Sequence, residues 1–600
     1  MKTVVTLLTF ILTVSVNILA FTDYKNTMND FMGVNVHAQL YFSHYLGSND
    51  EYDISKPFRW VRNYHPWGWF EETNDSYEWS FSGEGKWKYF DNYYGKLDQD
   101  SVNILISVIS PPEWVNGHPH SFHDNGEGKT ENNYRESAEY LAQLAARYGP
   151  SGSISPELLE TSDDIQGLDY CRYFEDSNEP NQWWESEYWH PRNYGAFLNA
   201  AHDGYGVQTN EALPIAGVKQ GDSEAVHVMG GMAGTGLTPS KKFEGSYLDT
   251  ALSASGRDAD QLFDIINFHQ YWNTTDSIPW TGAFGVCPEN GIYERGDSSI
   301  FKIIEWRNEN APGMPIWFTE FGWDTYTGGG TDHSYQFAPE LSQANYIMRS
   351  FALLKKEGID KAFVYFDHDP NSTGTTQYSS SGLVKDEAHN YERKTSFYFM
   401  TTMRRTIGSY RFAGADMHAQ GDPQVYVYRY TRTPQDLVLM VWCRDPRSII
   451  DNGTELDDFR IDVSGMVSCN QVLPENGLLD GQCSSLEVVD AGTEQSHVSV
   501  PVISETPLFL QITTEASTHS TRHSTKIVPS STPYRIRNRT VAFRHFTENQ
   551  RISVTRLDGK VEWEHNHSGM SEPAHTFKPG VYLYRIRNGG MVSSGRFLIR

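Results

Sequence analysis

Two glutamates lie in contexts that suit bond cleavage by paired carboxyl groups. Glu179 falls in the segment FEDSNEP (174–180) and Glu320 in the segment WFTEFGW (317–323), so each follows or ends an apolar run. Two carboxyl groups can cleave a glycosidic bond when one protonates the leaving oxygen and the other attacks the anomeric carbon. Their environments must differ, because one has to be protonated and the other ionised. Either glutamate alone would equally suit a helix cap or a surface carboxylate, so the prediction depends on the pair.

The elements that must position these glutamates alternate between short apolar runs and helical patterns. We predict eight strands, at residues 31–36, 59–64, 104–109, 170–177, 225–230, 265–271, 316–321 and 362–366. Apolar residues recur at three- and four-residue steps between several of them, for instance over 134–148 and 343–356, as in amphipathic helices. This order predicts an α/β fold, specifically a (β/α)8 barrel. Active sites of such barrels lie at the carboxyl ends of the strands, so Glu179 and Glu320 should share one site.

These segments resemble clan A of the glycoside hydrolases, a superfamily of retaining (β/α)8 barrel enzymes. The resemblance rests on NEP (178–180) after the fourth predicted strand and on TEFG (319–322) at the end of the seventh. It implies that Glu179 is the acid/base, that Glu320 is the nucleophile and that Asn178 holds the substrate hydroxyl next to the scissile bond. The resemblance covers the barrel at motif level and the later strands by architecture only.

The resemblance also suggests supporting residues. Arg62 matches the arginine on the clan's second strand, which would keep the nucleophile ionised through charge-assisted hydrogen bonds. A structural ion pair is the alternative role. Tyr271 resembles the tyrosine of a His-x-Tyr segment whose hydroxyl contacts the nucleophile, whereas His269 suits either a substrate contact or a hydrogen-bonded core position. His37 and Trp114 follow strands one and three and are predicted cleft residues.

Aromatic side chains near these strand ends can stack on sugar rings or pack within loops. Trp183 and Trp272 are the predicted substrate contacts among them, and the other candidates are Trp67, Trp69, Trp184, Tyr188 and Trp189. After the eighth strand, where the clan often presents a tryptophan, this chain has Asp367 and His368. That departure leaves the floor of the sugar site undefined by sequence.

The rest of the chain divides by composition. Residues 1–20, with Lys2 before an apolar run, are predicted to be a signal peptide, with an uncleaved anchor as the alternative. The barrel would then span 21–405. Residues 406–513 are predicted to form a β-sandwich, with strands at 425–430, 437–443, 459–463, 486–489, 497–502 and 508–512. A Ser/Thr-rich linker (514–532) and a small β module (533–600) follow.

The last region differs from the rest in charge. Residues 517–600 carry 14 Lys and Arg against 5 Asp and Glu, in a chain whose formal charge is -27. The segments KPGVYLYR (578–585) and GRFLIR (595–600) resemble the C-terminal sorting domain of type IX bacterial secretion. This resemblance implies recognition of the tail by secretion machinery and a secreted or cell-surface protein. An ordinary accessory β domain is the alternative.

Composition also limits the partners. A net negative charge repels phosphate backbones, so we expect no nucleic-acid partner. The five cysteines are too few and too widely spaced for a disulfide framework or a CxxC-type metal site, although Cys469 and Cys483 could pair. We expect no metal and no cofactor in the site, because the two-carboxylate mechanism requires neither. A structural ion elsewhere is the alternative that stays open.

We therefore expect a retaining endo-glycosidase that hydrolyses a β-linked polysaccharide, with endo-β-1,3-glucanase activity ranked first. Agarase-like activity remains open. So does an exo-acting enzyme such as a β-xylosidase, which would need a blocked pocket. The third alternative is a polysaccharide-binding protein that has kept the barrel and lost its chemistry.

Overall fold

The computed structural model of the chain describes most of residues 27–515 and the strands of residues 534–599. The described segments are 27–38, 57–79, 90–115, 130–152, 154–161, 163–182, 189–207, 216–238, 245–272, 286–294, 300–325, 337–374, 376–515, 534–537, 540–543, 551–556, 561–566, 574–576, 578, 580–588 and 591–599. The predicted signal peptide, Trp183 and all but the first two residues of the predicted linker lie outside them.

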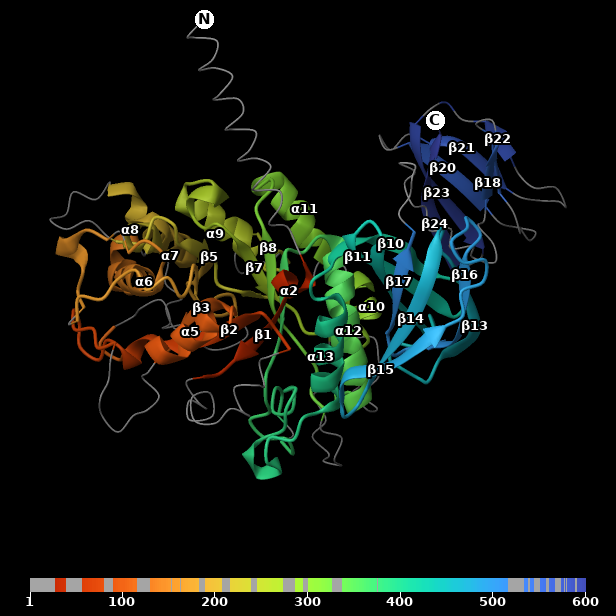
Figure 1. The fold of residues 1–600 in the computed structure, drawn as a ribbon. Helices are drawn as coiled ribbons and strands as arrows, with labels where there is room; N and C mark the ends of the chain where they lie inside the picture. The colour runs from red at the N-terminus through yellow and green to blue at the C-terminus, as the bar shows by residue number, and fades with distance from the viewer. Residues whose placement is uncertain are drawn as a thin grey trace, which may run out of the picture. The chain divides into compact units, whose positions relative to one another are not determined.

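Nine parallel strands form a curled sheet in the first part of the described chain (Figure 1). Its strands are β1 (Met32–Val36), β2 (Trp60–Pro66), β3 (Asn103–Ile109), β4 (Tyr173–Glu175), β5 (Val226–Val228), β6 (Met232–Ala233), β7 (Ile266–His269), β8 (Ile316–Phe321) and β9 (Lys361–Val364). Each of the eight predicted strands has a counterpart among them. The two-residue strand β6 was not predicted.

The sheet curls without closing through continuous strand pairing. Its order is β5-β4-β3-β2-β1-β9-β8-β7-β6. Between β5 and β7 the described pairing is a single bridge, Val228 with Ile265, flanked by a hydrogen bond from Asp264 N to His227 O (2.8 Å). After β5 the chain continues as β6, which pairs with the end of β7. The predicted parallel α/β sheet is thus confirmed, whereas the closed ladder of a (β/α)8 barrel is not.

The inside of the curled sheet is filled in layers by alternate residues of the strands. The first layer is aromatic: Trp60, Tyr173, Trp317 and Phe363 have neighbouring ring centroids 4.9 to 6.3 Å apart. Gly33 of β1 leaves room for this layer, because a Cβ there would lie 2.3 Å from the Phe363 ring. Residues i and i+2 of a strand face the same side. The residues two positions further along these strands therefore form a second layer, and that layer is mostly polar.

Helices cover the outside of the sheet. They are α2 (Met28–Phe31), α5 (Phe90–Gln99), α6 (Arg135–Tyr148), α7 (Pro191–Asp203), α8 (Val218–Gly221), α9 (Tyr247–Ser255), α10 (Pro288–Glu294), α11 (Ile300–Asn310), α12 (Glu340–Glu357) and α13 (Thr395–Ile407). The predicted helices at 134–148 and 343–356 correspond to α6 and α12. Helix α12 ends at Gly358, whose left-handed backbone (φ 89°) lets its N–H cap the carbonyls of Leu354 and Lys355.

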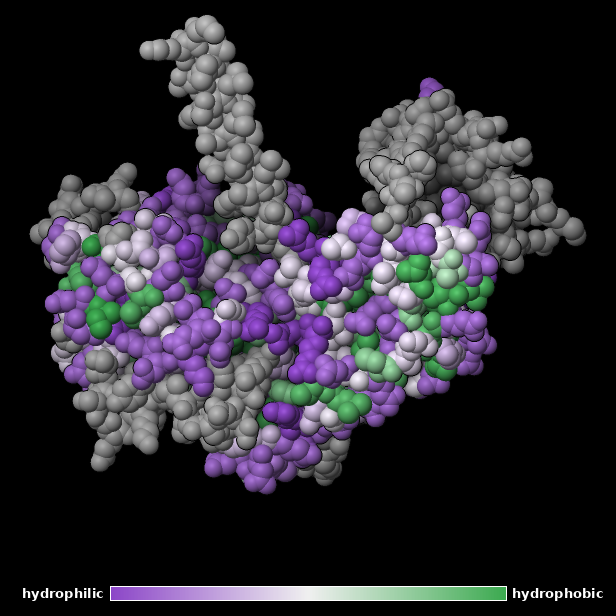
Figure 2. All heavy atoms as spheres, in the orientation of Figure 1, coloured by the Kyte–Doolittle hydropathy of each residue, from purple (hydrophilic) through white to green (hydrophobic). Residues whose placement is uncertain are grey.

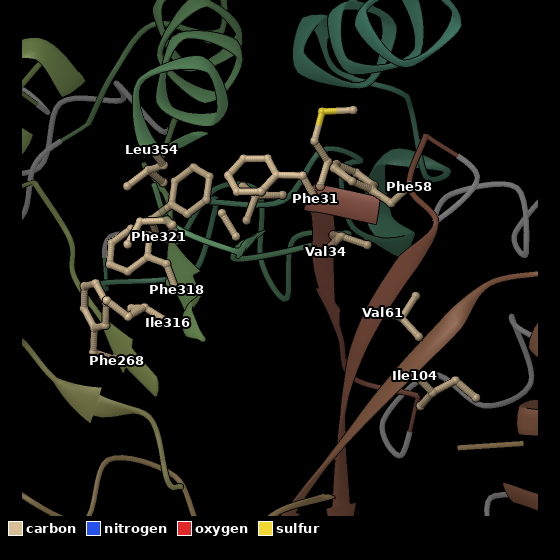
Figure 3. Close-up of a cluster of buried hydrophobic side chains, with 14 of the residues drawn as sticks. Phe31, Val34, Phe58, Val61, Ile104, Phe268, Ile316, Phe318, Phe321 and Leu354 are labelled. Atoms are coloured by element: carbon tan, nitrogen blue, oxygen red, sulfur yellow. The ribbon is translucent and has the colours of Figure 1, made fainter. Parts of the chain in front are cut away.

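The apolar core lies between the sheet and these helices. Phe351 of α12 packs edge-on against Phe31 of α2 and Phe321 of β8, with ring centroids 6.1 and 5.2 Å apart. Burial of each such side chain stabilises the fold by about 1.5–3 kcal/mol. Figure 3 shows part of this core, with Phe31, Val34, Phe58, Val61, Ile104, Phe268, Ile316, Phe318, Phe321 and Leu354 labelled. Over the helices, the face drawn in Figure 2 is mostly hydrophilic.

Antiparallel sheets follow the parallel one. A six-stranded sheet has the order β10-β11-β12-β17-β14-β15, and β13 pairs with β16 in a separate two-stranded sheet. Their bounds are β10 (Arg411–Gln420), β11 (Gln424–Thr433), β12 (Asp436–Arg444), β13 (Glu455–Asp462), β14 (Met466–Glu475), β15 (Leu478–Leu486), β16 (His497–Ser504) and β17 (Leu508–Thr514). The predicted strand at 486–489 is wrong, because β15 ends at Leu486. Strands β10, β14 and β15 were not predicted.

The cysteines of this region are unpaired. All five cysteines are free; Cys469 is buried and Cys483 is exposed. The register of β14 and β15 places Cys469 opposite Leu486 and Cys483 opposite Val472. The suggested Cys469–Cys483 disulfide is therefore not formed.

The chain forms two compact units. One comprises Met1–Phe459, Val467–Glu487 and Pro501–Ala516, and the other Arg460–Met466, Val488–Val500 and Ser517–Arg600. The first contains the parallel sheet and strands β10, β11, β12 and β17. Within it, buried Arg349 of α12 forms ion pairs with Asp451 (2.6 Å) and Glu289 (3.3 Å), which tie the helices to the antiparallel region. Trp442 of β12 donates to Glu289 (2.8 Å).

The second unit contains the C-terminal strands β18 (Tyr534–Arg537), β19 (Thr540–Phe543), β20 (Arg551–Arg556), β21 (Val561–Asn566), β22 (Ala574–Thr576), β23 (Gly580–Asn588) and β24 (Met591–Ile599). β23 and β24 pair antiparallel over the two segments that resemble a sorting domain. The bounds of the five predicted segments and the role of the tail stay predictions. Among the described residues, no helix combines the length and apolarity that crossing a membrane requires.

Candidate active site

Glu179 and Glu320 meet at the carboxyl edge of the curled sheet. Glu320 is the fifth residue of β8, and Glu179 lies four residues beyond the end of β4. A carboxyl oxygen of each lies within 4.8 Å of the other. The Glu320 side chain is 6% exposed and the Glu179 side chain 13%, so both carboxyls lie in a largely desolvated site. The two residues that the sequence singled out are therefore neighbours.

The polar layer beneath them follows from strand alternation. Two residues beyond the aromatic layer, β2 carries Arg62, β4 carries Glu175 and β8 carries Thr319. At the corresponding level, β7 carries Asn267 and β1 carries Asn35. All five are buried at 0% exposure. The apolar layer fills the inside of the sheet, and the polar layer next to it supplies hydrogen-bond partners to the buried charged groups of the site.

Glu320 is held by three donors. Arg62 Nη1 donates to Oε1 at 2.6 Å and Tyr64 donates to the same oxygen at 2.5 Å, while Tyr271 donates to Oε2 at 2.7 Å. Burial opposes ionisation of Glu320, but the neighbouring His269 and Arg62 and the two tyrosine hydroxyls outweigh it and lower the pKa. The carboxylate form of Glu320, which a nucleophile needs, is thus favoured.

Glu179 occupies a different environment. Its backbone is left-handed (φ 47°), an uncommon conformation for a residue with a side chain, and its N–H donates to Gly231 O at 3.0 Å. Oε1 lies 2.9 Å from His269 Nδ1, and Gln182 Nε2 donates to Oε2. Burial raises the pKa of Glu179, and the contact with His269 offsets this only in part. The protonated form, which a general acid needs, is favoured.

Arg62 connects the nucleophile to its surroundings. Its guanidinium pairs with both oxygens of Glu175 (2.5 and 3.0 Å) as well as with Glu320. It also donates to Asn178 Oδ1 at 2.8 Å, which turns the Asn178 amide nitrogen away from the arginine. Arg62 therefore contacts Glu320 and also forms a buried structural ion pair with Glu175, as the two alternatives from the sequence suggested.

A register shift places Thr319 and Glu320 on the same side of the sheet. In the pairing of β7 with β8, Phe268 lies opposite Phe318 but His269 lies opposite Glu320. Thr319 is therefore an extra residue without a partner in β7. Such a bulge redirects side chains that strict alternation would send to opposite faces. Thr319 contacts His269 and Asn267 inside the sheet, and Glu320 still reaches Arg62.

Aromatic side chains line one side of the two glutamates. The Tyr378 ring lies 4.8 Å from that of Tyr271 and 5.3 Å from that of Tyr365. Tyr365 also contacts His37, with its hydroxyl 3.2 Å from Nε2. Burial lowers the pKa of His37 to about 3, so this ring is neutral. Tyr365, two residues before Asp367, supplies the ring at the end of the eighth predicted strand.

The other predicted site residues lie elsewhere. Trp272 is 1% exposed and packs against Phe318, Phe321 and Trp323, so it belongs to the core and we withdraw it as a substrate contact. Trp114 is half-buried, and its Nε1 donates to Glu71 O at 3.0 Å. Its substrate contact stays a prediction, as does that of Trp183, which lies outside the described residues.

Two of the remaining aromatic candidates are also core residues. Trp189 stacks on Tyr134 with centroids 5.7 Å apart, and Trp67 stacks on Tyr140 at 5.1 Å. Both are under 4% exposed. Loop and core packing therefore explains them, whereas Trp69 is half-buried.

Sequence reasoning missed several residues of the site. Tyr64 and Asn267 lie two residues from Arg62 and His269, so strand alternation was the signal that would have identified them. Glu175 follows the same rule from Tyr173. Tyr365 follows the same rule from Phe363, whereas Tyr378 had no such signal, because its position depends on how the chain continues after β9. The Tyr378 N–H donates to Asp324 Oδ2 at 2.9 Å, which fixes that segment against the chain after β8.

Glu179, His269 and Glu320 also satisfy the spacing of a metal site, since one atom of each lies within 4.8 Å of the others. Hydrogen bonds account for this spacing without a metal: the Glu179–His269 contact is 2.9 Å, and the Arg62 cation lies against Glu320. A second acidic set, Asp75, Glu139 and Glu160, is similarly spaced. Burial raises the pKa of Glu139 to about 8, so a proton can relieve the repulsion there.

Comparisons with known proteins are sparse. No family model matches the sequence, and no curated protein matches it. A conserved exported protein from Bacteroides fragilis matches in structure with a TM-score of 0.49 and 9% identity, over 81% of this chain and 98% of that one. A GH39 beta-xylosidase from Caulobacter crescentus gives a TM-score of 0.45 and 15% identity, over 81% and 96%.

A third structure, SrfJ from Salmonella typhimurium, has a TM-score of 0.44 and 12% identity, over 81% of this chain and 90% of that one. Similarities of this size do not assign an activity. The function has to be argued from the arrangement of the side chains.

Proposed function

We propose that this protein is a secreted retaining glycoside hydrolase of a β-linked polysaccharide, with Glu320 as the nucleophile and Glu179 as the acid/base. The observation that supports it most is the pair of buried carboxyl groups with oxygens within 4.8 Å and pKa values shifted in opposite directions. Retaining glycosidases hold their two carboxyls about 5–5.5 Å apart, and inverting ones about 6.5–9.5 Å apart to admit a water. The short separation favours retention.

In the first step Glu320 attacks the anomeric carbon. The bond to the leaving oxygen breaks, that oxygen takes the proton of Glu179, and a glycosyl ester forms on Glu320. Hydrogen bonds from Arg62 and Tyr64 to Oε1 leave Oε2, with its single bond from Tyr271, as the freer oxygen. We assign the attack to Oε2 on this ground.

In the second step water replaces the glutamate. The Glu179 carboxylate takes a proton from the water, the water oxygen bonds to the anomeric carbon, and Glu320 leaves as a carboxylate. Two inversions at the same carbon restore the starting configuration. Arg62, with its permanent charge, stabilises the negative charge that returns to Glu320.

The surroundings suit a neutral sugar ring. Asn178 accepts from Arg62 through Oδ1, so Arg62 does not use its amide N–H groups, and we assign these groups to a substrate hydroxyl. The rings of Tyr271, Tyr365 and Tyr378 offer apolar faces beside the glutamates, and such faces pack against the C–H groups of a sugar. The β-1,3-glucan substrate rests on the sequence contexts of Glu179 and Glu320, and endo action rests on the aromatic candidates in the loops after the strands.

The test is proton NMR of the purified protein incubated with laminarin, mixed-linkage glucan, agarose, xylan and mannan. We expect β-configured oligosaccharides of mixed length from one polymer, appearing before mutarotation. Monosaccharides alone would indicate exo action. Binding of a polymer without turnover would overturn the proposal and support a non-catalytic binding protein.

The two roles are separated by azide, a small anion that can occupy the space of a removed carboxylate. In Glu320→Ala, azide attacks from the nucleophile's side and should give a glycosyl azide of inverted configuration. In Glu179→Ala, azide attacks the glycosyl ester and should give the retained configuration. Glu305→Ala, which removes an exposed carboxyl on α11, is the matched control and should behave as the native protein. Exchanged product configurations would reverse our assignment.

A further inference from the structure

A chain of buried hydrogen bonds runs behind His269, and its direction can be read from its first member. Glu175 accepts from Arg62 Nε (2.5 Å), Arg62 Nη2 (3.0 Å), Gly231 N (3.0 Å) and Asn267 Nδ2 (2.8 Å). Guanidinium and backbone N–H groups can only donate, so Glu175 acts as an acceptor throughout. A flipped Asn267 amide would put its oxygen against a Glu175 oxygen and is disfavoured.

The orientation of Asn267 determines that of Thr319. With the Asn267 nitrogen turned to Glu175, its Oδ1 faces the Thr319 hydroxyl at 2.6 Å and can only accept. Thr319 has one hydroxyl proton and gives it to Asn267. Only its lone pairs are then left for His269 Nε2, which lies 2.9 Å from Oγ1. His269 must therefore carry a hydrogen on Nε2.

The other nitrogen of His269 faces the proposed acid. His269 Nδ1 lies 2.9 Å from Glu179 Oε1 and 3.6 Å from Glu320 Oε1, and Arg62 Nη1 lies 2.6 Å from that oxygen of Glu320. With Nε2 already protonated, a neutral His269 has a bare Nδ1. A bare nitrogen and an ionised carboxylate at 2.9 Å would be two facing acceptors, so one proton has to lie between them.

We propose that Asn267 and Thr319 are positioning residues that fix His269 as an Nε2–H donor, so that Glu179 and His269 share one proton in the resting enzyme. The inference rests on the proposed role of Glu179, because the shared proton is the one that passes to the leaving oxygen. To deliver it, Glu179 breaks its bond to His269. Glu179 regains a proton from water in the second step, so the protons balance over one cycle.

The chain also links the two carboxyls through one arginine. Arg62 pairs with Glu320 directly and with Glu175 at the start of the chain, and the chain ends on Glu179. The same ion pair that keeps the nucleophile ionised thus sets the orientation that keeps the acid protonated. A free imidazole could instead donate from Nδ1, which would favour an ionised Glu179.

The first test is nitrogen-15 NMR of histidine-labelled protein, which reports the protonated ring nitrogen whether or not any sugar is cleaved. His269 is assigned among the 21 histidines by the signals lost in His269→Gln. We expect Nε2 to be protonated from pH 5 to pH 8 in the native protein. A bare Nε2 would overturn the inference directly and would leave the proposed function untouched.

The second test is the pair Thr319→Val and Thr319→Ser. Valine keeps the branched shape without the hydroxyl, so His269 is free to place its proton on Nδ1, while serine keeps the hydroxyl. We expect the Nδ1–H form in the valine variant and the native form in the serine variant. The alkaline limb of kcat/KM should move to lower pH by about one unit in the valine variant only.

The leaving group distinguishes positioning from general damage. At pH 7 the valine variant should lose about tenfold or more in rate on phenyl glycosides of the released sugar, which need acid assistance. Dinitrophenyl glycosides, which do not, should change by less than about threefold. Equal losses on both would mean a merely structural role and would overturn the inference. If the native protein cleaves no glycoside, the proposed function fails, and the NMR result still decides the orientation of His269.

Discussion

A Cβ atom on Gly231 would lie 2.0 Å from Nε2 of His269. No other residue type therefore fits beneath the imidazole in its present position. The Gly231 backbone also donates to Glu175 and accepts from the Glu179 N–H. Gly231 lies shortly after β5 and contacts Glu179, His269 and Glu175, so its backbone helps to fix the positions of all three relative to one another.

Gly231→Ala should therefore displace the His269 ring and lower kcat at least about 100-fold, since a shift of about 1 Å in a catalytic group costs that much. The measurement is kcat with melting temperature as the check on folding. Gly245→Ala is the matched control, because a Cβ there meets only Thr250 Oγ1 at an ordinary 3.5 Å. Native activity in the Gly231 variant would show that the position of His269 does not matter.

Tyr64 and Tyr271 donate to different oxygens of Glu320, at 2.5 and 2.7 Å. Tyr64→Phe and Tyr271→Phe should each lower kcat/KM about 10- to 100-fold, the worth of a hydrogen bond to a charged group. Tyr140→Phe is the control and should have native activity, because the described structure shows no hydrogen bond to that buried hydroxyl. Unchanged rates in both site variants would argue against Glu320 as the nucleophile.

The pH dependence follows from the two pKa shifts. Activity needs an ionised Glu320, whose pKa is lowered, and a protonated Glu179, whose pKa is raised. A bell-shaped profile of kcat/KM is expected, with Glu320 setting the acid limb and Glu179 the alkaline limb. Because Tyr64 helps to lower the pKa of Glu320, Tyr64→Phe should move the acid limb to higher pH and leave the alkaline limb in place. If Tyr64→Phe moved the alkaline limb alone, Glu320 would be the acid/base and our assignment of the two glutamates would be reversed.

Much of the fold could be predicted because hydrophobic runs mark buried parallel strands. Every predicted strand of the parallel sheet has a counterpart, and β8 matches its predicted bounds. The closed strand ladder of the barrel is the part of the prediction that is not confirmed, since the chain after β5 continues into the two-residue strand β6. Two residues are too short a run to stand out in a sequence. Among the antiparallel strands, β10, β14 and β15 carry many exposed positions, so no apolar run marked them.

The site was predictable where chemistry and strand position coincide. Glu179, Glu320, Arg62 and Tyr271 could be identified because each has a distinctive type near a strand end. Trp272 misled, because a tryptophan after a strand looks the same in sequence whether it faces a cleft or the core. Thr319 follows strand alternation when it is counted from Trp317, but not when it is counted from Glu320, because the bulge in β8 brings Thr319 and Glu320 to the same side.

Arg349 offers a test of how the parallel sheet's helices are joined to the antiparallel region. It is fully buried, and it faces Asp451 at 2.6 Å and Glu289 at 3.3 Å. Arg349→Met should lower the melting temperature by several degrees, because removing one partner of a buried ion pair costs about 3–5 kcal/mol. Lys302→Met removes an exposed partner of Glu305 and is the control, with no measurable change expected.

The loss of melting temperature in Arg349→Met should also depend on pH. Burial already raises the pKa of Asp451 to about 6 in the native protein, and loss of the arginine raises it further. A carboxyl whose pKa is raised by folding binds a proton more tightly in the folded state, so its contribution to stability is present at low pH and is lost as the pH rises through the folded pKa. The melting temperatures of the variant and the native protein should therefore lie closer together at pH 5 than at pH 8. An equal deficit at both values would mean that Asp451 is not left as an uncompensated charge, and that the loss comes from packing of the Arg349 side chain alone.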